Sequence, residues 1–219
     1  MSGKVLYGVK MAVATPLVEA TQLPEEGKAI TFKTAEEVGI EKVVSEGSEE
    51  VKRVDDEILA VVTTQDIGYG YNLSLVDNVF QLDFLALLEG GTIRYDSSEP
   101  RKVVGYDDPM MSGGATTSRF QLELYIPSYA GTDIESYVKL TFPNCIGTAS
   151  KLEFKKEFAS PEFSIKAREA SKIKKPSRLI DIVAPDELPS EVAQAIAKQE
   201  EQAKLLAAKA STEDKKSAK

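Results

Sequence analysis

Large apolar side chains recur at every second position in three long stretches of the chain. These stretches are residues 67–75, 120–126 and 138–142. Because successive side chains of a β-strand point to opposite faces, this alternation predicts strands with one buried face. Shorter stretches of similar character are residues 58–64, 92–95, 103–106, 151–154, 163–168 and 179–183. About ten strands in one chain predict a mainly β fold, an antiparallel β-sandwich or β-barrel.

Residues 79–88 follow a helical period instead, with large apolar side chains at intervals of three and four. These side chains are Phe80, Phe84, Leu87 and Leu88. The spacing predicts one packed α-helix that lies on the β-core. Asn78 and Gln81 form a capping-box pattern at its start, and Gly90 with Gly91 ends it.

A long hairpin arm is predicted for residues 39–56. Its predicted tip, residues 46–50, is rich in Glu, Gly and Ser. Such a segment has too few apolar residues to bury itself, so we expect a mobile arm or one that docks on a neighbour.

The character of the chain suggests three parts. Residues 1–37 are expected to be an N-terminal arm or extended segment, and residues 38–184 the β-domain. Residues 185–219 are rich in Ala, Gln, Glu and Lys and predict a helical extension that projects from the body and ends in a disordered tail. Its apolar stripe is thin and consists of Val192, Ile196 and Leu206.

The composition argues against most catalytic and metal sites. The chain has no His, no Trp and one Cys, Cys145. Absence of His removes the usual triads and zinc sites, and one Cys forms no internal disulfide. Two acidic runs, residues 55–57 and 107–108, lack the spacing of a calcium loop, which favours solvated turns. We therefore predict no catalytic residue, cofactor or metal, and we expect neither a secretory signal nor a membrane span.

Charge is unevenly distributed along the chain, which has a net charge of -8. Residues 36–57 hold nine acidic and three basic side chains, whereas residues 151–178 hold nine basic and four acidic ones. The acidic balance argues against a protein that binds nucleic acid tightly. The two segments are either solvated surfaces or opposite surfaces that meet in a head-to-tail contact between copies.

The order of these features resembles a known family. An acidic hairpin leads into Tyr69-Gly70-Tyr71, a single helix ends at Leu87-Leu88-Glu89-Gly90-Gly91, and further strands lead to the segment Ser160-Pro161-Glu162-Phe163-Ser164-Ile165-Lys166-Ala167-Arg168-Glu169. This order is similar to that of the major tail protein, or tail tube protein, of long-tailed bacteriophages and phage-like elements. The resemblance covers residues 38–182, and the C-terminal helix is not part of it.

The resemblance implies a structural virion protein rather than an enzyme. Members of that family fold as a β-sandwich flanked by a helix and form hexameric rings, which stack into the tube through which DNA leaves the capsid. The implied partners are further copies of the chain, tape-measure, tail-terminator and baseplate or tip proteins, and passing DNA, with no membrane. The implied location is the virion tail, assembled in the host cytoplasm.

Three groups of residues are candidates for this assembly. The hairpin arm would contact the adjacent ring through Glu46, Glu49, Glu50, Lys52 and Arg53. The basic counter-surface would be Lys151, Lys155, Lys156, Lys172, Lys174 and Lys175. The channel would be lined by the polar faces of two strands, at Gln121, Glu123, Lys139 and Thr141, although these positions also suit the outside of a sandwich.

Other functions stay open at this level. A tube protein of a contractile or secretion-type injection system has the same architecture, and a capsid decoration protein or another virion structural protein is the next alternative. An enzyme would need a concave cluster of carboxylates or Tyr side chains. A carbohydrate-binding sandwich would need more aromatic platforms than a chain without Trp offers.

Overall fold

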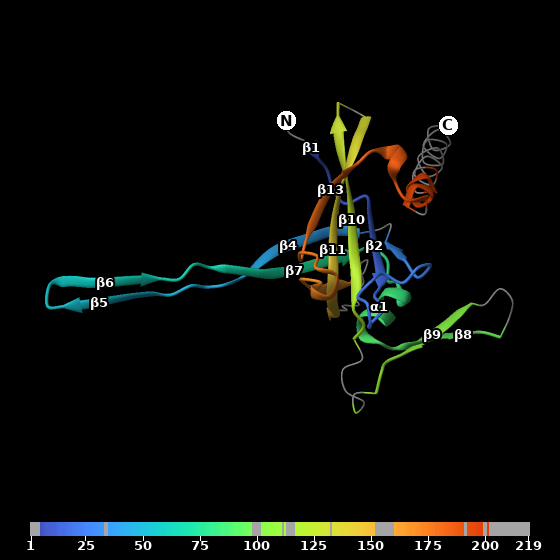
Figure 1. Cartoon of the computed structure of the whole chain (residues 1–219). Coiled ribbons are helices and arrows are strands. Elements are labelled where there is room, and N and C mark those ends of the chain that lie inside the picture. Colours follow the sequence, from blue (N-terminus) through green and yellow to red (C-terminus); the bar gives the residue numbers. More distant parts are fainter. Residues whose placement is uncertain are drawn as a thin grey trace, which may run out of the picture.

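The computed structural model describes residues 5–32, 35–97, 102–110, 112, 117–131, 133–151, 160–190, 192–198 and 201. Figure 1 shows a β-rich body from which two hairpins project. The fold is mainly β with a large antiparallel sheet, which confirms the predicted class and is consistent with a β-sandwich.

Nine strands form the main sheet, and every pair in it is antiparallel. The strands are β1 (Val5–Leu6), β2 (Met11–Pro16), β3 (Ile30–Phe32), β4 (Ala35–Ser45), β7 (Ile67–Asp77), β10 (Phe120–Ala130), β11 (Asp133–Lys151), β12 (Glu162–Arg168) and β13 (Leu179–Val183). Their order is β3-β2-β10-β11-β12-β7-β4, with β1 paired to β10 and β13 to β11. The long strand β11 therefore pairs along one edge with both β13 and β12, at residues 137–141 and 145–151.

The N-terminal residues belong to the body, which corrects the expectation of an extended arm over residues 1–37. β2 lies between β3 and β10, and Met11, Ala12 and Ala14 are fully buried. Because residues 11–14 are all apolar, both faces of β2 can be covered. The body therefore begins well before residue 38.

Helix α1 (Leu82–Glu89) is shorter than the predicted helix. Asn78 does not cap it, because the helix begins after Gln81, whose side chain makes no capping hydrogen bond. The Val79 N–H instead donates to the Asp77 carboxylate, and Phe80 is 43% exposed rather than part of the core. The C-terminal end is as predicted, since Gly90 takes the left-handed conformation at φ 78°.

Phe84 of α1 is the centre of the main core. Its ring lies edge-on to the rings of Phe32, Phe120 and Phe163, at centroid distances of 4.2, 6.1 and 4.9 Å. These three side chains come from β3, β10 and β12, which are well separated in the sheet order. The sheet therefore curls around α1, and the predicted packing of one helix on the β-core is confirmed.

A second, smaller core lies on the other face of β2, β10 and β11. Val192, Ala195 and Ile196 of the helical residues 192–198 pack there with Met11, Val13, Tyr125 and Tyr137. This corrects the expected projection of the C-terminal extension at its first turns, because Val192 and Ile196 share one helix face and cover apolar side chains. Leu206 and the predicted disordered tail lie outside the described residues.

The remaining elements are short or peripheral. They are the ribbon β5 (Glu49–Val54) with β6 (Glu57–Thr63), the hairpin β8 (Thr92–Tyr95) with β9 (Val103–Asp107), and the 3-10 turns η2 (Ser171–Ile173) and η3 (Pro185–Glu187). Among the helices within the described ranges, none has the length and apolar character needed to cross a membrane.

Candidate functional site

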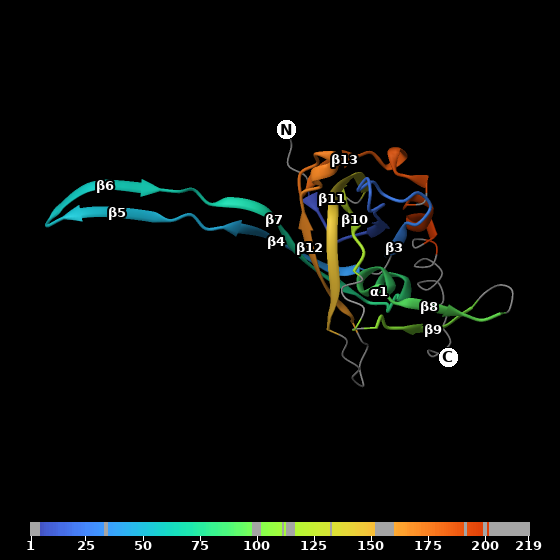
Figure 2. The same ribbon diagram turned by 60° about the horizontal axis from the view of Figure 1, so that its bottom comes forward.

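The arm is the most prominent feature outside the body. β4 pairs with β7, and the two strands continue into the ribbon β5–β6, which Figures 1 and 2 show extending far from the sheet. The prediction of a long hairpin is confirmed, but its predicted bounds, residues 39–56, are wrong, since the hairpin spans residues 35–77. Its tip is the turn at Asp55 and Asp56, where Asp55 has φ 48°, and not residues 46–50.

Residues 46–50 lie instead at a joint halfway along the arm. The Gly47 N–H donates to Asp66 Oδ1 at 2.8 Å, and the Ser48 N–H donates to Thr64 Oγ1 at 2.6 Å. A Cβ atom on Gly47 would lie 1.9 Å from the Thr64 carbonyl oxygen, so a larger residue would separate the two strands. Side-chain acceptors thus hold the two strands of the arm together at the joint, where the pairing of β4 with β7 has ended and that of β5 with β6 has not begun.

The candidate arm residues are all on the surface. Glu46 lies at the joint, and Glu49, Glu50, Lys52 and Arg53 lie in β5, whose side chains are exposed throughout. The neighbouring strand β6 is apolar, and its Ile58, Leu59, Val61 and Val62 are each at least 50% exposed. Sequence reasoning predicted this strand but not its exposure. The available signal was the unbroken apolar run 58–62, which is typical of a strand covered on both faces.

The predicted basic counter-surface is described only in part. Lys155 and Lys156 and the side chain of Lys151 lie outside the described residues. Lys172, Lys174 and Lys175 are all exposed, and Lys172 donates from Nζ to the Glu19 carbonyl in the loop after β2 at 2.9 Å. In the described part of the chain, no ion pair joins these lysines to the acidic side chains of the arm.

The root of the arm carries cation–aromatic contacts that sequence reasoning missed. The Arg168 guanidinium lies 5.1 Å from the ring centroid of Tyr69, and that of Arg178 lies 4.6 Å from Tyr71. Tyr71 also packs edge-on to Phe142 at 6.1 Å. Because such contacts stabilise both side chains, they help hold the arm to the body where β7 leaves it.

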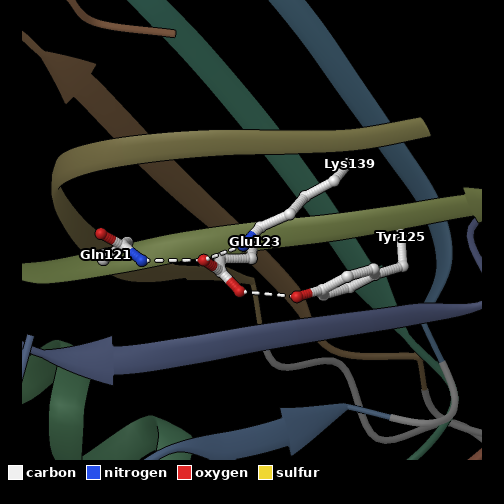
Figure 3. Close-up of polar contacts among 4 residues, drawn as sticks. All are labelled: Gln121, Glu123, Tyr125 and Lys139. Carbon is white, nitrogen blue, oxygen red and sulfur yellow. Dashed lines mark hydrogen bonds and ion pairs between the residues drawn. The ribbon is translucent and has the colours of Figure 1, made fainter. Parts of the chain in front are cut away.

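The four candidate channel residues come together on one face of β10 and β11. Glu123 accepts a hydrogen bond from Gln121 Nε2 at 2.9 Å and one from the Tyr125 hydroxyl at 2.8 Å, as Figure 3 shows. Lys139 Nζ lies 2.7 Å from Glu123 Oε1. Thr141 is opposite Glu123 in the strand register and is buried. The alternation of β10 and β11 predicted this shared face correctly, but it did not predict the role of Tyr125.

The electrostatics of this polar cluster, Gln121, Glu123, Tyr125 and Lys139, are balanced. The Glu123 and Lys139 side chains are 15% and 21% exposed and neutralise each other. Burial, and then the charge of Glu123, raise the pKa of the Tyr125 phenol. The phenol therefore stays protonated and donates to the carboxylate, so the cluster contributes no net charge to this face.

The same face also carries the second core. Met11 and Val13 are opposite Tyr125 and Glu123 in the register of β2 and β10. The helical residues 192–198 pack on the apolar side chains among these. The helical residues 192–198 therefore border the candidate channel surface. The sequence resemblance, which ends at residue 182, does not include them.

Cys145 is fully buried, and its burial raises the pKa of the thiol, which keeps it in the unreactive protonated form. Within the ranges given above, no group of three or more Cys, Asp and Glu side chains is placed to hold a metal ion.

Comparison with known proteins gives a weak similarity to a solved structure. No protein-family model and no curated protein matches the chain. Among solved structures, the chain is similar to the tube-terminating cap of the anti-feeding prophage, with 10% identity and a TM-score of 0.34. That similarity covers 84% of this chain and 94% of the cap chain. It is too weak to assign either a fold or a function.

Proposed function

We propose that this chain is the structural subunit of a phage-type tail tube. In this proposal, copies form hexameric rings that stack into a tube, and the tube forms the channel for DNA ejection. The observation that carries the proposal is the arm of residues 35–77, whose outer strands expose apolar side chains far from the body. The sequence resemblance to the tail tube family supplies the kind of assembly.

The arm needs a partner for physical reasons. An isolated two-stranded ribbon is only marginally stable in water, and an unpaired strand edge readily pairs with another chain. Burial of a Val, Leu or Ile side chain contributes about 1.5–3 kcal/mol, so covering β6 favours association strongly. Contact between different surfaces of identical subunits is head-to-tail, and such contacts continue into rings or open filaments.

Opposite charges would guide this contact. Glu46, Glu49 and Glu50 of the arm meet the lysines of residues 151–175 on the adjacent ring in this proposal. Both sets, where described, are exposed, and Lys172 Nζ binds two carbonyl groups of its own chain. Complementary potentials of this kind set the register and speed of association more than the final affinity.

The proposal places Gln121, Glu123, Lys139 and Thr141 beside the channel. The chain has a net charge of -8, so a channel built from it repels phosphate and lets DNA slide. The chain is assigned no catalytic activity and no cofactor. Its further partners are tape-measure, tail-terminator and baseplate or tip proteins, in a virion tail assembled in the host cytoplasm.

A tube protein of a contractile or secretion-type injection system is the nearest alternative, since the arm suits both. A capsid decoration protein, or another virion structural protein, is the second, because exposed apolar strands also suit binding to a shell.

Negative-stain electron microscopy of the purified, concentrated chain tests the proposal, with light scattering of the fresh sample as the reference. Hollow tubes or six-fold rings are the expected result. A compact closed oligomer without a channel would contradict the proposal and favour a decoration protein.

A further inference from the structure

A groove lies between the edge strand β3 and helix α1. Its volume is about 620 Å³, and its lining includes the apolar residues Ala29, Ile30, Ala86 and Leu87 and the charged residues Lys28 and Asp83. β3 pairs with β2 and, within the described residues, with no second strand, and its Ile30 and Thr31 line the groove. Such a groove offers backbone partners on one side and apolar side chains on the other.

We infer that this groove receives strand β6 from the arm of a second copy of the chain. The inference deepens the proposed function and rests on it, because it names the surface on which the arm docks. β6 offers what the groove lacks, namely an unpaired strand edge in the described structure and an apolar run from Ile58 to Val62. Addition of an extended strand to a sheet edge is a common mode of protein recognition.

The apolar character of β6 supports a covered position rather than a surface one. Ile58 and Val61, opposite Arg53 and Val51, point to one face of the ribbon, and Val62, opposite Glu50, points to the other. Pairing of β6 with the edge of β3 would satisfy free backbone groups of both strands, and α1 would cover one apolar face of β6.

The contact is between copies because the arm points away from its own groove. Figure 2 shows β5 and β6 on one side of the body and β3 and α1 on the other. One copy therefore provides an arm and presents a groove at opposite sides, which is the head-to-tail arrangement that polymerises.

Cross-linking between two full-length single variants tests this inference. Val61→Cys and Ala86→Cys are mixed and treated with a short bis-maleimide, and heterodimers are measured on a denaturing gel. Cys145 is kept, because it is fully buried. The control replaces Val61→Cys by Val5→Cys, a valine that is 69% exposed on the body. We expect about tenfold more heterodimer than in the control, because docked thiols react at a raised effective concentration.

A second measurement blocks the groove. Ala86→Arg is compatible with a helix and fills the groove, so we expect an unchanged melting temperature and loss of assembly. Val104→Arg, on the exposed strand β9, is the control and should assemble normally.

The outcomes separate this inference from the proposed function. Tubes that form without the cross-link, or that form from Ala86→Arg, overturn the groove as the docking site and leave the tube proposal standing. A cross-link in concentrated protein that never forms tubes supports the groove and contradicts the tube. No cross-link and no tubes overturn both.

Discussion

Lys139 Nζ lies 2.7 Å from Glu123 Oε1 across the β10–β11 pair, and both side chains are mostly buried. Glu123 also accepts from Gln121 and Tyr125, so one carboxylate holds three donors on one sheet face. The ion pair is therefore a structural element of the sheet, whichever compartment that face meets in the assembly.

Replacing Lys139 by Met should destabilise the monomer. The substitution leaves the Glu123 carboxylate partly buried with two neutral donors and no counter-charge. We expect the free energy of unfolding to fall by about 1–3 kcal/mol, measured by urea denaturation. The double variant Lys139→Met with Glu123→Gln serves as the control, because it removes the unpaired charge. A double variant that is no more stable than Lys139→Met would show that the charge is not the cause.

Tyr125 should make the stability of the folded chain fall at alkaline pH. Burial and the Glu123 charge raise its pKa, so the folded state keeps a proton that the unfolded chain loses near pH ~10. The folded state then binds more protons than the unfolded state, and linkage requires stability to decrease as pH rises. This contribution is complete below the unfolded pKa and is lost above it.

The measurement is the free energy of unfolding from about pH 8 to 11 for the wild type and for Tyr125→Phe. Other Tyr and Lys side chains titrate in both proteins, so the difference between the two curves isolates Tyr125. We expect the wild type to lose stability more steeply. Parallel curves would contradict the role assigned to burial of this phenol.

Phe84→Ala should be the most damaging single truncation in the helix. It removes a fully buried ring that contacts three other Phe rings from three strands. Core Phe→Ala changes cost about 3–5 kcal/mol, which is a large part of the stability of an ordinary domain. Phe80→Ala is the matched control, since Phe80 is close in sequence but exposed. Thermal or urea unfolding should show a small effect for Phe80→Ala, and equal losses would contradict the position of α1.

Reversing charge on the arm should block assembly without unfolding the chain. Glu49→Lys with Glu50→Lys changes two exposed positions of β5, so circular dichroism and the melting temperature should not change. Under the proposed function, the lysines of the adjacent ring would repel this arm, and tube growth should stop. Asp186→Lys with Glu187→Lys makes the same charge change at two adjacent exposed acids on the body. Electron microscopy should show tubes from the control alone, and unaltered tubes from the arm variant would exclude the charge contact.

The alternation of side chains was sufficient to predict most strands, but it wrongly predicted a buried face over all of residues 67–75, since Ile67 and Tyr69 are exposed and only Leu73 and Leu75 are buried. It predicted that Gln121 and Glu123 share a face with Lys139 and Thr141, which the register of β10 and β11 confirms. It also predicted burial of Phe84 and the end of α1 at Gly90. These features depend on local geometry, since the period of a strand or a helix is set within a few residues.

The sequence did not predict which strands are neighbours. The hairpin was expected over residues 39–56, but β4 pairs with β7 and the turn lies at Asp55. Period and composition do not distinguish a strand that pairs with its nearest neighbour from one that pairs further along the chain. The exposure of Ile58 to Val62 was missed for the same reason, because an apolar strand in a projecting arm has the sequence of a buried one.

The sequence by itself determined the mainly β class, the packed helix and the presence of a long hairpin arm, because each depends on a short-range pattern. Only the tertiary structure decided that Val192 and Ile196 pack on Met11 and Tyr125, that Lys139 pairs with Glu123, and that β3 and α1 border a groove. These contacts join segments far apart in the chain. Their formation depends on how the sheet curls around Phe84, which no local pattern specifies.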